Sequence, residues 1–449
     1  MITTATLGFP RIGPQRELKK SLDAHWAGRL DVAGLEAAAR SLRRRRWETQ
    51  RLRGISVVPS NDFSLYDHVL DACCLVRALP ERFAIPAGRI DMAAYFRCAR
   101  GSEGVQPLEM TKWFDTNYHY LVPEFTPGQR FIADASKPFA EFLEAKALGL
   151  HTRPVLLGPV SFLRLGKLEG GGDPLTLLPS LLPAYASVLA DLISAGTDWV
   201  QIDEPCLATD LTDPARQAYH TAYAALAGVH PRLRLMLTTY FGGLDDNLAL
   251  ACSLPVAGLH LDLIRAPHQL DAALPLLTQG QVLSLGVIDG RNVWRGDLDR
   301  ALQAVATVRS ARPDLILQVA PSCSLLHVPV DVQSETALTS ELRAWLAFAV
   351  QKLEELDLIG RAANGEAVGT ELTAARQVQA LRRSAPGSVI AAVRDRCAAV
   401  GDHHRVSPFA ERAPAQQRRL RLPAFPTTTI GSFPQTTEVR ARRAAWRRG

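Results

Sequence analysis

The residues best placed for chemistry are polar side chains that follow predicted buried strands. In parallel β/α proteins, residues just past the carboxyl ends of the strands form the active site. That rule selects Asn61, Asp62, Asp203, Glu204, Tyr240, Asp262, Asp289, Ser322 and Cys323. Asp203 and Glu204 are the best carboxylate pair for acid–base work. Because adjacent residues on a strand face opposite ways, they cannot act as a close dyad, and a structural role for them is the favoured alternative.

Cysteine and histidine spacing does not predict a metal centre. The sequence has no C-x-x-C, H-x-C or H-E-x-x-H motif, and its seven cysteines are scattered. Cys323 and His327 are a lone close pair, which is more often buried packing than metal ligation. We therefore expect no metal ligand in this chain and a reducing compartment instead of a disulfide framework.

Two segments carry features of a ligand site. Residues 4–20 predict a short strand, a tight turn and the start of a helix that holds the positive charges of Arg16 and Lys19. Residues 110–125 hold five aromatic residues interleaved with polar ones such as Lys112. This second segment is either a packed loop or one wall of a small-molecule site.

Buried strands alternate with helices as far as residue 358, which is typical of parallel β/α construction. About nine strand candidates occur, close to the eight of a closed barrel. One of them, within residues 110–125, must be an insert or lie outside the barrel. The sequence thus predicts an α/β fold with a (β/α)8 TIM-type barrel over residues 1–360, whose last helix covers 335–358. A helical and extended connector should follow over residues 361–425.

The first segment has an echo near the end of the chain. T-T-T-I-G-S-F-P-Q-T-T-E-V-R at residues 427–440 repeats the threonines, the glycine, the Phe-Pro and the acidic–aliphatic–basic trio of residues 4–20 in the same order. An echo this distant suggests a duplicated unit. We expect residues 426–449 to be the opening strand and turn of a truncated second barrel, which would make the chain the first half of a duplicated two-barrel protein.

Composition narrows the class of protein. The chain has 449 residues, 47% of them hydrophobic and 21% charged, with a net charge of +6. The N-terminus lacks a basic region followed by an apolar run, and the apolar stretch at 175–196 is interrupted by Pro179, Pro183 and Asp191, so it predicts a buried helix. We expect a cytoplasmic protein without a membrane partner. Its diffuse positive charge fits an anionic small molecule at least as well as nucleic acid, and no nucleic-acid motif is present.

Several longer motifs occur together and span nearly the whole chain. They are T-L-G-F-P-R-I-G-P-Q-R-E-L-K-K at 6–20, E-M-T-K-W-F-D-T-N-Y-H-Y-L-V-P-E-F at 109–125, L-L-G-P-V at 156–160, V-Q-I-D-E-P at 200–205, G-R-N-V-W-R at 290–295, S-C-S-L-L-H at 322–327 and P-T-T-T-I-G-S-F-P-Q-T-T-E at 426–438. Together they resemble the cobalamin-independent methionine synthases, the 5-methyltetrahydropteroyltriglutamate–homocysteine methyltransferase family. The resemblance implies two face-to-face barrels and methyl transfer from N5 of a folate polyglutamate to the sulfur of homocysteine.

The resemblance also implies roles for particular residues. Folate would be held by Gln15, Arg16, Glu17, Leu18, Lys19 and Lys112, and homocysteine would be contacted by Ile430, Gly431 and Ser432. The catalytic residues and the ligands of a zinc ion would lie in the second barrel, and cobalamin would not be used. The chain by itself should then be an inactive monomer that normally packs against its own second barrel.

Three other functions are alternatives to methyl transfer. A stand-alone folate-polyglutamate binding barrel would use the same basic residues without catalysis. A lyase of the uroporphyrinogen decarboxylase type is disfavoured because the motifs extend over the full chain. A nucleic-acid binder would have to use the arginine clusters, such as residues 43–46, which we interpret as a solvated helix face.

Overall fold

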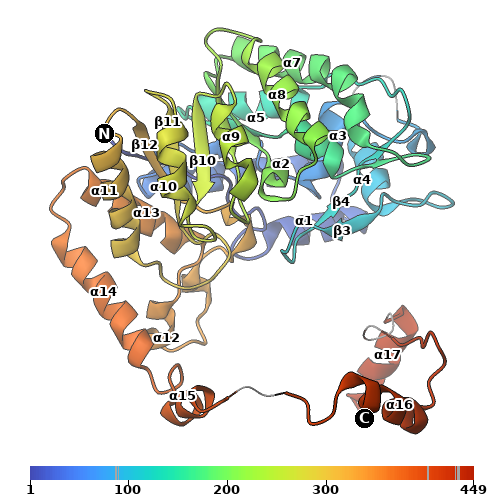
Figure 1. The fold of residues 1–449 in the computed structure, drawn as a ribbon. Helices are drawn as coiled ribbons and strands as arrows, with labels where there is room; N and C mark the ends of the chain where they lie inside the picture. The colour runs from blue at the N-terminus through green and yellow to red at the C-terminus, as the bar shows by residue number, and fades with distance from the viewer. Residues whose placement is uncertain (86–87, 89, 402–403, 430, 432–434) are drawn as a thin grey trace. The chain divides into compact units, whose positions relative to one another are not determined.

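The computed structural model describes residues 1–85, 88, 90–401, 404–429, 431 and 435–449. The chain forms two compact units, Met1–Arg383 and Ser384–Gly449. Figure 1 shows both.

The first unit is built on an eight-stranded parallel sheet whose order is β1-β12-β11-β10-β9-β8-β6-β2. The strands are β1 (Thr3–Thr4), β2 (Pro59–Ser60), β6 (Arg153–Leu157), β8 (Trp199–Asp203), β9 (Arg234–Thr238), β10 (Gly258–Asp262), β11 (Val282–Ile288) and β12 (Ile316–Pro321). A parallel bridge between Ala5 and Val57 joins the two ends of this order, and Val57 N donates to Thr4 O at 2.9 Å. The sheet is therefore a closed ring, and the predicted (β/α)8 barrel is confirmed.

Helices of the first unit surround the ring or extend its loops. They are α1 (Glu17–Trp26), α2 (Val32–Leu52), α3 (His68–Leu75), α4 (Met92–Arg100), α5 (Ser136–Ala147), α6 (Pro159–Arg164), α7 (Leu178–Ala195), α8 (Asp213–Ala227), α9 (Leu248–Ser253), α10 (Gln269–Ala273), α11 (Leu298–Ala311), α12 (Ser340–Trp345), α13 (Ala349–Ala363) and α14 (Gly369–Ser384). Helices α7 and α8 pack side by side on the outside of the barrel (Figure 1). Short 3-10 turns fill several loops, among them η2 (Pro174–Leu177) and η6 (Leu325–His327).

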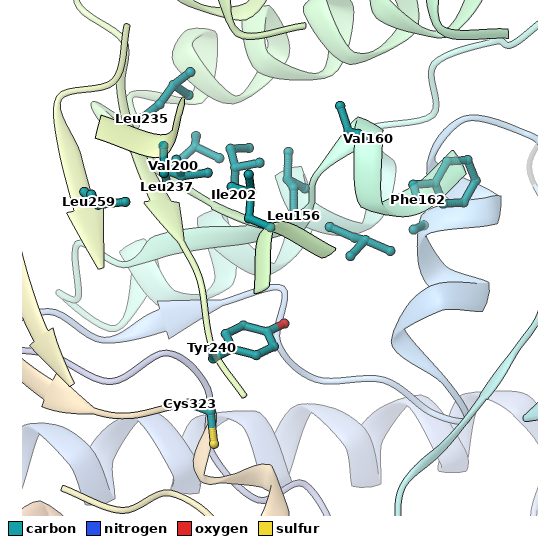
Figure 2. Packing of buried hydrophobic residues seen from close by; sticks show 14 of the residues in the cluster. Leu156, Val160, Phe162, Val200, Ile202, Leu235, Leu237, Tyr240, Leu259 and Cys323 are labelled. Atoms are coloured by element: carbon teal, nitrogen blue, oxygen red, sulfur yellow. The ribbon is translucent and has the colours of Figure 1, made fainter. Parts of the chain in front are cut away.

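The barrel has an apolar outer layer and a polar interior. Val200, Ile202, Leu235 and Leu237 alternate along neighbouring strands and belong to the same buried cluster as side chains of α6 (Figure 2). Several intervening positions are polar: Arg153 on β6 donates across the barrel to Gln318 on β12 at 3.1 Å and to Gln201 on β8 at 3.2 Å. Since successive side chains of a strand face opposite ways, the period-2 pattern separates these two layers.

The aromatic segment, residues 110–125, lies outside the ring of strands. This agrees with the prediction that one of the nine strand candidates is not part of the barrel. The segment forms an antiparallel hairpin of β3 (Met110–Lys112) and β4 (His119–Leu121), and β5 (Glu124–Phe125) pairs with β7 (Lys167–Leu168). The hairpin is tied to the amino terminus of α3 by Asp67, whose carboxylate accepts from Leu121 N at 3.0 Å and from Leu70 N at 2.9 Å.

The prediction of one continuous helix over residues 335–358 is wrong. The structure has two helices there, α12 and α13, because the intervening backbone pairs with the loop after β11. Leu346 forms an antiparallel bridge with Trp294, and Ala347 N donates to Val293 O at 2.8 Å. Those hydrogen bonds replace the helical ones that a continuous helix would make.

The apolar stretch near residue 180 is a helix of the barrel's outer layer. Pro174–Ala195 is long and apolar enough to cross a membrane, and 56% of its most apolar window is buried inside the protein. Leu181, Tyr185 and Val188 on α7 are fully buried, in agreement with the prediction of a buried helix.

Past residue 360 the chain continues as helices. Helix α14 packs on the barrel unit, since Arg376 pairs with Asp299 at 2.8 Å, so the boundary predicted at residue 360 falls inside the first compact unit. The second unit contains α15 (Ala391–Ala398), α16 (Phe409–Leu420) and α17 (Thr437–Trp446). The described residues of 426–436 form no strand. A parallel barrel strand needs a neighbouring strand, and the described part of this unit supplies none.

Candidate functional site

A cavity of about 850 Å³ lies at the carboxyl ends of the barrel strands. Four of the predicted strand-end residues line it: Asn61, Asp62, Asp203 and Tyr240. The predicted Glu204, Asp262, Asp289, Ser322 and Cys323 are not among the described lining residues. The cavity has the size and the mixed apolar and polar lining of a small-molecule site.

Asp203 and Glu204 face opposite sides of β8, as predicted. Asp203 accepts hydrogen bonds from Gln201 Nε2 at 2.8 Å and from Tyr240 Oη at 3.1 Å, and burial raises the pKa of its carboxyl to about 7. Glu204 points away from the cavity and accepts from Ser161 N at 2.8 Å, and burial likewise raises its pKa to about 7. Glu204 thus holds the start of α6, and Asp203 alone reaches the cavity.

Asp262 and Asp289 are structural carboxylates. Asp262 accepts from the backbone N–H groups of Ile264 at 3.0 Å and Arg265 at 2.9 Å, and burial raises its pKa to about 6. Asp289 accepts from Arg291 N at 2.7 Å. Both carboxylates therefore shape the loops after their strands, which satisfies backbone donors that would otherwise be unpaired.

The residues predicted to hold folate divide into exposed and packed ones. Gln15, Arg16 and Lys19 are exposed at the start of α1, and Lys112 is exposed on β3. Leu18 is buried in a small cluster with residues of α2, and Glu17 pairs with Arg45 at 2.7 Å. Lys19 pairs with Asp23 at 2.6 Å, whereas Arg16 and Lys112 have no carboxylate partner among the described residues.

The structure brings the first segment and the aromatic segment together through Arg11. Its guanidinium lies 5.5 Å from the centre of the Tyr118 ring, and Nη2 donates to Tyr66 O at 2.6 Å. Tyr118 in turn donates to Asp67 at 2.6 Å. From the aromatic segment, Trp113 reaches the cavity lining.

Several residues that line the cavity were not predicted as site residues, notably Arg11, His68 and Lys137. His327 also lines it, although at the sequence level this residue was considered only with Cys323. Burial lowers the pKa of both His68 and His327 to about 3, so both rings are neutral at pH 7. Lys137 donates to Asn61 Oδ1 at 2.7 Å and pairs with Glu141 at 3.3 Å. His68 and Lys137 come from helices α3 and α5, and no sequence motif marks helix residues that turn toward a barrel mouth.

Cys323 and His327 do not fit a zinc site. The Cys323 thiol is 1% exposed, and burial raises its pKa, which opposes the thiolate form that binds metal. Within the part of the chain that the structure describes, no group of three or more His, Cys, Asp or Glu residues could hold a metal ion.

The closed parallel ring with a cavity at its carboxyl end makes the first unit a (β/α)8 barrel of the kind that binds small molecules. Residues 3–313 match the family described as cobalamin-independent synthase, N-terminal domain, and residues 425–449 match the catalytic domain of the same family. The chain therefore belongs to the cobalamin-independent methionine synthase family.

Two curated relatives carry the same name. The chain is 54% identical over 472 aligned residues to the 5-methyltetrahydropteroyltriglutamate–homocysteine methyltransferase of Caulobacter vibrioides, covering 100% of this chain and 61% of the relative. It is 52% identical over 465 residues to the protein of that name from Chelativorans sp., covering 100% of this chain and 60% of the relative. The chain thus spans about three fifths of the length of these relatives.

Solved structures share the fold at low identity. A B12-independent methionine synthase from Shewanella sp. W3-18-1, in complex with selenomethionine, has a TM-score of 0.57 at 14% identity over 83% of this chain and 99% of that chain. A vitamin-B12-independent methionine synthase from Listeria monocytogenes, itself named as putative, has a TM-score of 0.51 at 14% identity over 81% of this chain and 98% of that chain.

Proposed function

We propose that this chain forms the folate-holding barrel of an enzyme that transfers a methyl group from 5-methyltetrahydropteroyltriglutamate to homocysteine, giving methionine. The observation that carries the proposal is the match to both domains of the synthase family. In the reaction, the homocysteine sulfur forms a bond to the methyl carbon. The bond from that carbon to N5 breaks, and N5 keeps the electron pair and takes a proton.

The polyglutamate tail is the part of the substrate that this chain is equipped to bind. The tail carries several carboxylates, and Arg16 and Lys112 are exposed cations whose charge is not neutralised by a carboxylate of the described chain. Gln15 and Lys19 are exposed on the first segment, as Arg16 is. Leu18 and Glu17 would act by fixing the start of α1, through the buried leucine cluster and the Arg45 ion pair.

In this proposal, the residues that contact homocysteine belong to the second unit. Gly431 is exposed, and the predicted Ile430 and Ser432 lie outside the described residues. Zinc, which would keep the homocysteine sulfur as a thiolate when bound, belongs in this proposal to the second barrel, because Cys323 and His327 do not fit it.

Replacing Lys112 by Gln in a protein that carries both barrels tests the role of this chain. Because the lysine would meet the tail and not the pterin, we expect affinity for the triglutamate substrate to fall about tenfold and affinity for the monoglutamate to change less than twofold. Competition binding with both folates gives the two values. Arg232, exposed before the amino end of β9, supplies the control R232Q, which should bind both folates normally. Equal losses for both folates in K112Q would contradict the electrostatic role.

A folate-polyglutamate binding barrel without catalysis is the second candidate, favoured by the same unpaired cations. Methionine formation by the two-barrel protein separates the two, since only the methyltransferase predicts it.

A further inference from the structure

The cavity at the barrel mouth contains one cation that forms no direct ion pair with a described residue. The lining holds four permanently charged cations: Arg11, Arg40, Arg43 and Lys137. Arg43 pairs with Glu144 at 2.6 Å, Lys137 with Glu141 at 3.3 Å, and Arg40 with Glu36 at 3.9 Å. Arg11 has no carboxylate within ion-pair distance among the described residues, and it donates hydrogen bonds to the oxygens of Tyr66 and Tyr118.

Three carboxylates of the same lining form no ion pair with a described residue, and only one of them, Asp203, lies at the end of a barrel strand. The lining carboxylates are Glu36, Asp62, Asp71, Asp91, Asp134, Glu141, Glu144 and Asp203. All but three form ion pairs with arginine or lysine side chains. Asp91 and Asp134 accept from backbone N–H groups at helix starts, at 2.6 Å from Ala94 and 3.1 Å from Ser136. Asp203 accepts only from the neutral donors Gln201 and Tyr240, and it forms no ion pair with a described residue. Arg153, which donates to the same Gln201, acts on Asp203 from beyond that amide.

Arg11 and Asp203 lie on different walls of the cavity. A series of ring contacts leads from one to the other: Tyr240 touches Phe241 at 4.6 Å between centroids, Phe241 touches His327 at 5.4 Å, and His327 touches Tyr118 at 6.4 Å. Tyr240 binds Asp203, and Tyr118 lies under Arg11. The cavity lining also includes apolar and aromatic side chains, among them Leu156, Leu157 and Trp113.

We propose that this cavity binds a small zwitterion whose carboxylate and ammonium stand at opposite ends of an uncharged spacer, with the carboxylate on Arg11 and the ammonium on Asp203. A molecule of this class gives each of these two groups a direct ion-pair partner and places its spacer on the apolar and aromatic side chains of the lining. An α-amino acid carries its two charges on adjacent groups, so its binding tests whether the spacer is needed. The site is separate from the exposed cations Arg16 and Lys112, so the proposal does not depend on folate binding.

Isothermal titration calorimetry of the 449-residue chain tests the charge pattern with 6-aminohexanoate, hexanoate, hexylamine and L-leucine as probes. We expect 6-aminohexanoate to bind at least about tenfold more tightly than the other three, because each charge-assisted contact contributes about a factor of ten. The proposal would be overturned if hexanoate, hexylamine or L-leucine bound as tightly as 6-aminohexanoate. It would also be overturned if 6-aminohexanoate did not bind at about 10 mM, a concentration far above the dissociation constant of a specific site.

Two substitutions assign the ends of the ligand. R11M should weaken 6-aminohexanoate about tenfold and leave hexylamine unchanged, and D203N should weaken 6-aminohexanoate about tenfold and leave hexanoate unchanged. R11K, which keeps the charge, should recover part of the affinity and guards against a loss caused by misfolding. The matched controls are R40M and E36Q, which alter a cation and a carboxylate of the same lining that pair with each other. Normal binding by R11M and D203N, or equal losses in the controls, would show that these charges do not define the site.

Discussion

At the scale of single residues, Asp203 shows how a strand end gives one carboxylate a role that its neighbour cannot share. Glu204 turns away and holds the start of α6, while Asp203 faces the cavity beside Tyr240. Burial of Asp203 without a cationic partner at ion-pair distance favours its protonated form, and its pKa is raised from 3.8 to about 7.

The raised pKa of Asp203 makes stability depend on pH in a definite direction. Between the unfolded and folded pKa values the folded protein binds this proton more tightly, so this residue's contribution to stability is lost as pH rises through that window. D203N removes the titration, so the free energy of unfolding of D203N minus that of wild type should be larger at pH 8 than at pH 5 by about 2 kcal/mol. Urea unfolding at the two pH values measures this difference.

Asp191 provides the control for this experiment. It is exposed on α7 and forms no ion pair with a described residue, so the relative stability of D191N should change little between the same two pH values. A D203N difference that is the same at pH 5 and pH 8 would mean that the carboxyl is not protonated in the folded protein near neutrality.

At the scale of elements, the β3–β4 hairpin is positioned from outside the barrel by one buried carboxylate. Asp67 caps α3 through Leu70 N, accepts from Leu121 N on β4, and accepts from the Tyr118 hydroxyl at 2.6 Å. Tyr118 lies against Arg11, so the same carboxylate fixes the hairpin, the helix start and one wall of the cavity.

Removal of the Asp67 carboxylate should therefore release the hairpin as well as the helix end. D67A should lower the free energy of unfolding by about 3 kcal/mol, because it leaves buried N–H donors without acceptors, and should open residues 113–118 to proteases. Denaturant unfolding and limited proteolysis give the two readouts. D91A removes the cap of α4, whose Asp91 accepts from Ala94 N, and should cost about 1 kcal/mol with the hairpin still protected. Equal protease resistance of D67A and wild type would refute the anchoring role.

At the scale of the whole molecule, the first unit is a complete barrel with its own core, and the second unit is helical in its described part. The centre that would activate homocysteine is not formed by Cys323 and His327, whose environment keeps the thiol protonated and the imidazole neutral. Free thiols are mostly protonated near neutral pH, which makes them poor nucleophiles toward the methyl group of a tertiary amine.

The 449-residue chain expressed alone should accordingly hold less than one equivalent of zinc and form no detectable methionine. Metal analysis by mass spectrometry and a methionine-formation assay with 5-methyltetrahydropteroyltriglutamate test the two statements. A full-length relative assayed in parallel is the positive control. Stoichiometric zinc together with measurable methyl transfer would show that the first barrel carries a reaction centre of its own.

The sequence alone determined the barrel class, most strand positions and the opposite orientation of Asp203 and Glu204. These features follow from local patterns: buried strands alternate with helices, and side chains alternate along a strand with a period of two. The sequence also indicated that one strand candidate near residue 110 had to lie outside the ring, because a closed barrel takes eight strands.

Only the tertiary structure decided which residues meet at the barrel mouth. Arg11, His68 and Lys137 reach one cavity from a loop and two helices that are far apart in sequence. The local sequence around each of these residues does not indicate that the other two lie nearby. The break of the helix between Trp345 and Ala349 likewise depends on backbone hydrogen bonds to a loop some fifty residues earlier, at Val293. Local propensity is set by neighbours in the chain, whereas the charges left without a partner in the cavity are set by how the closed ring brings distant segments together.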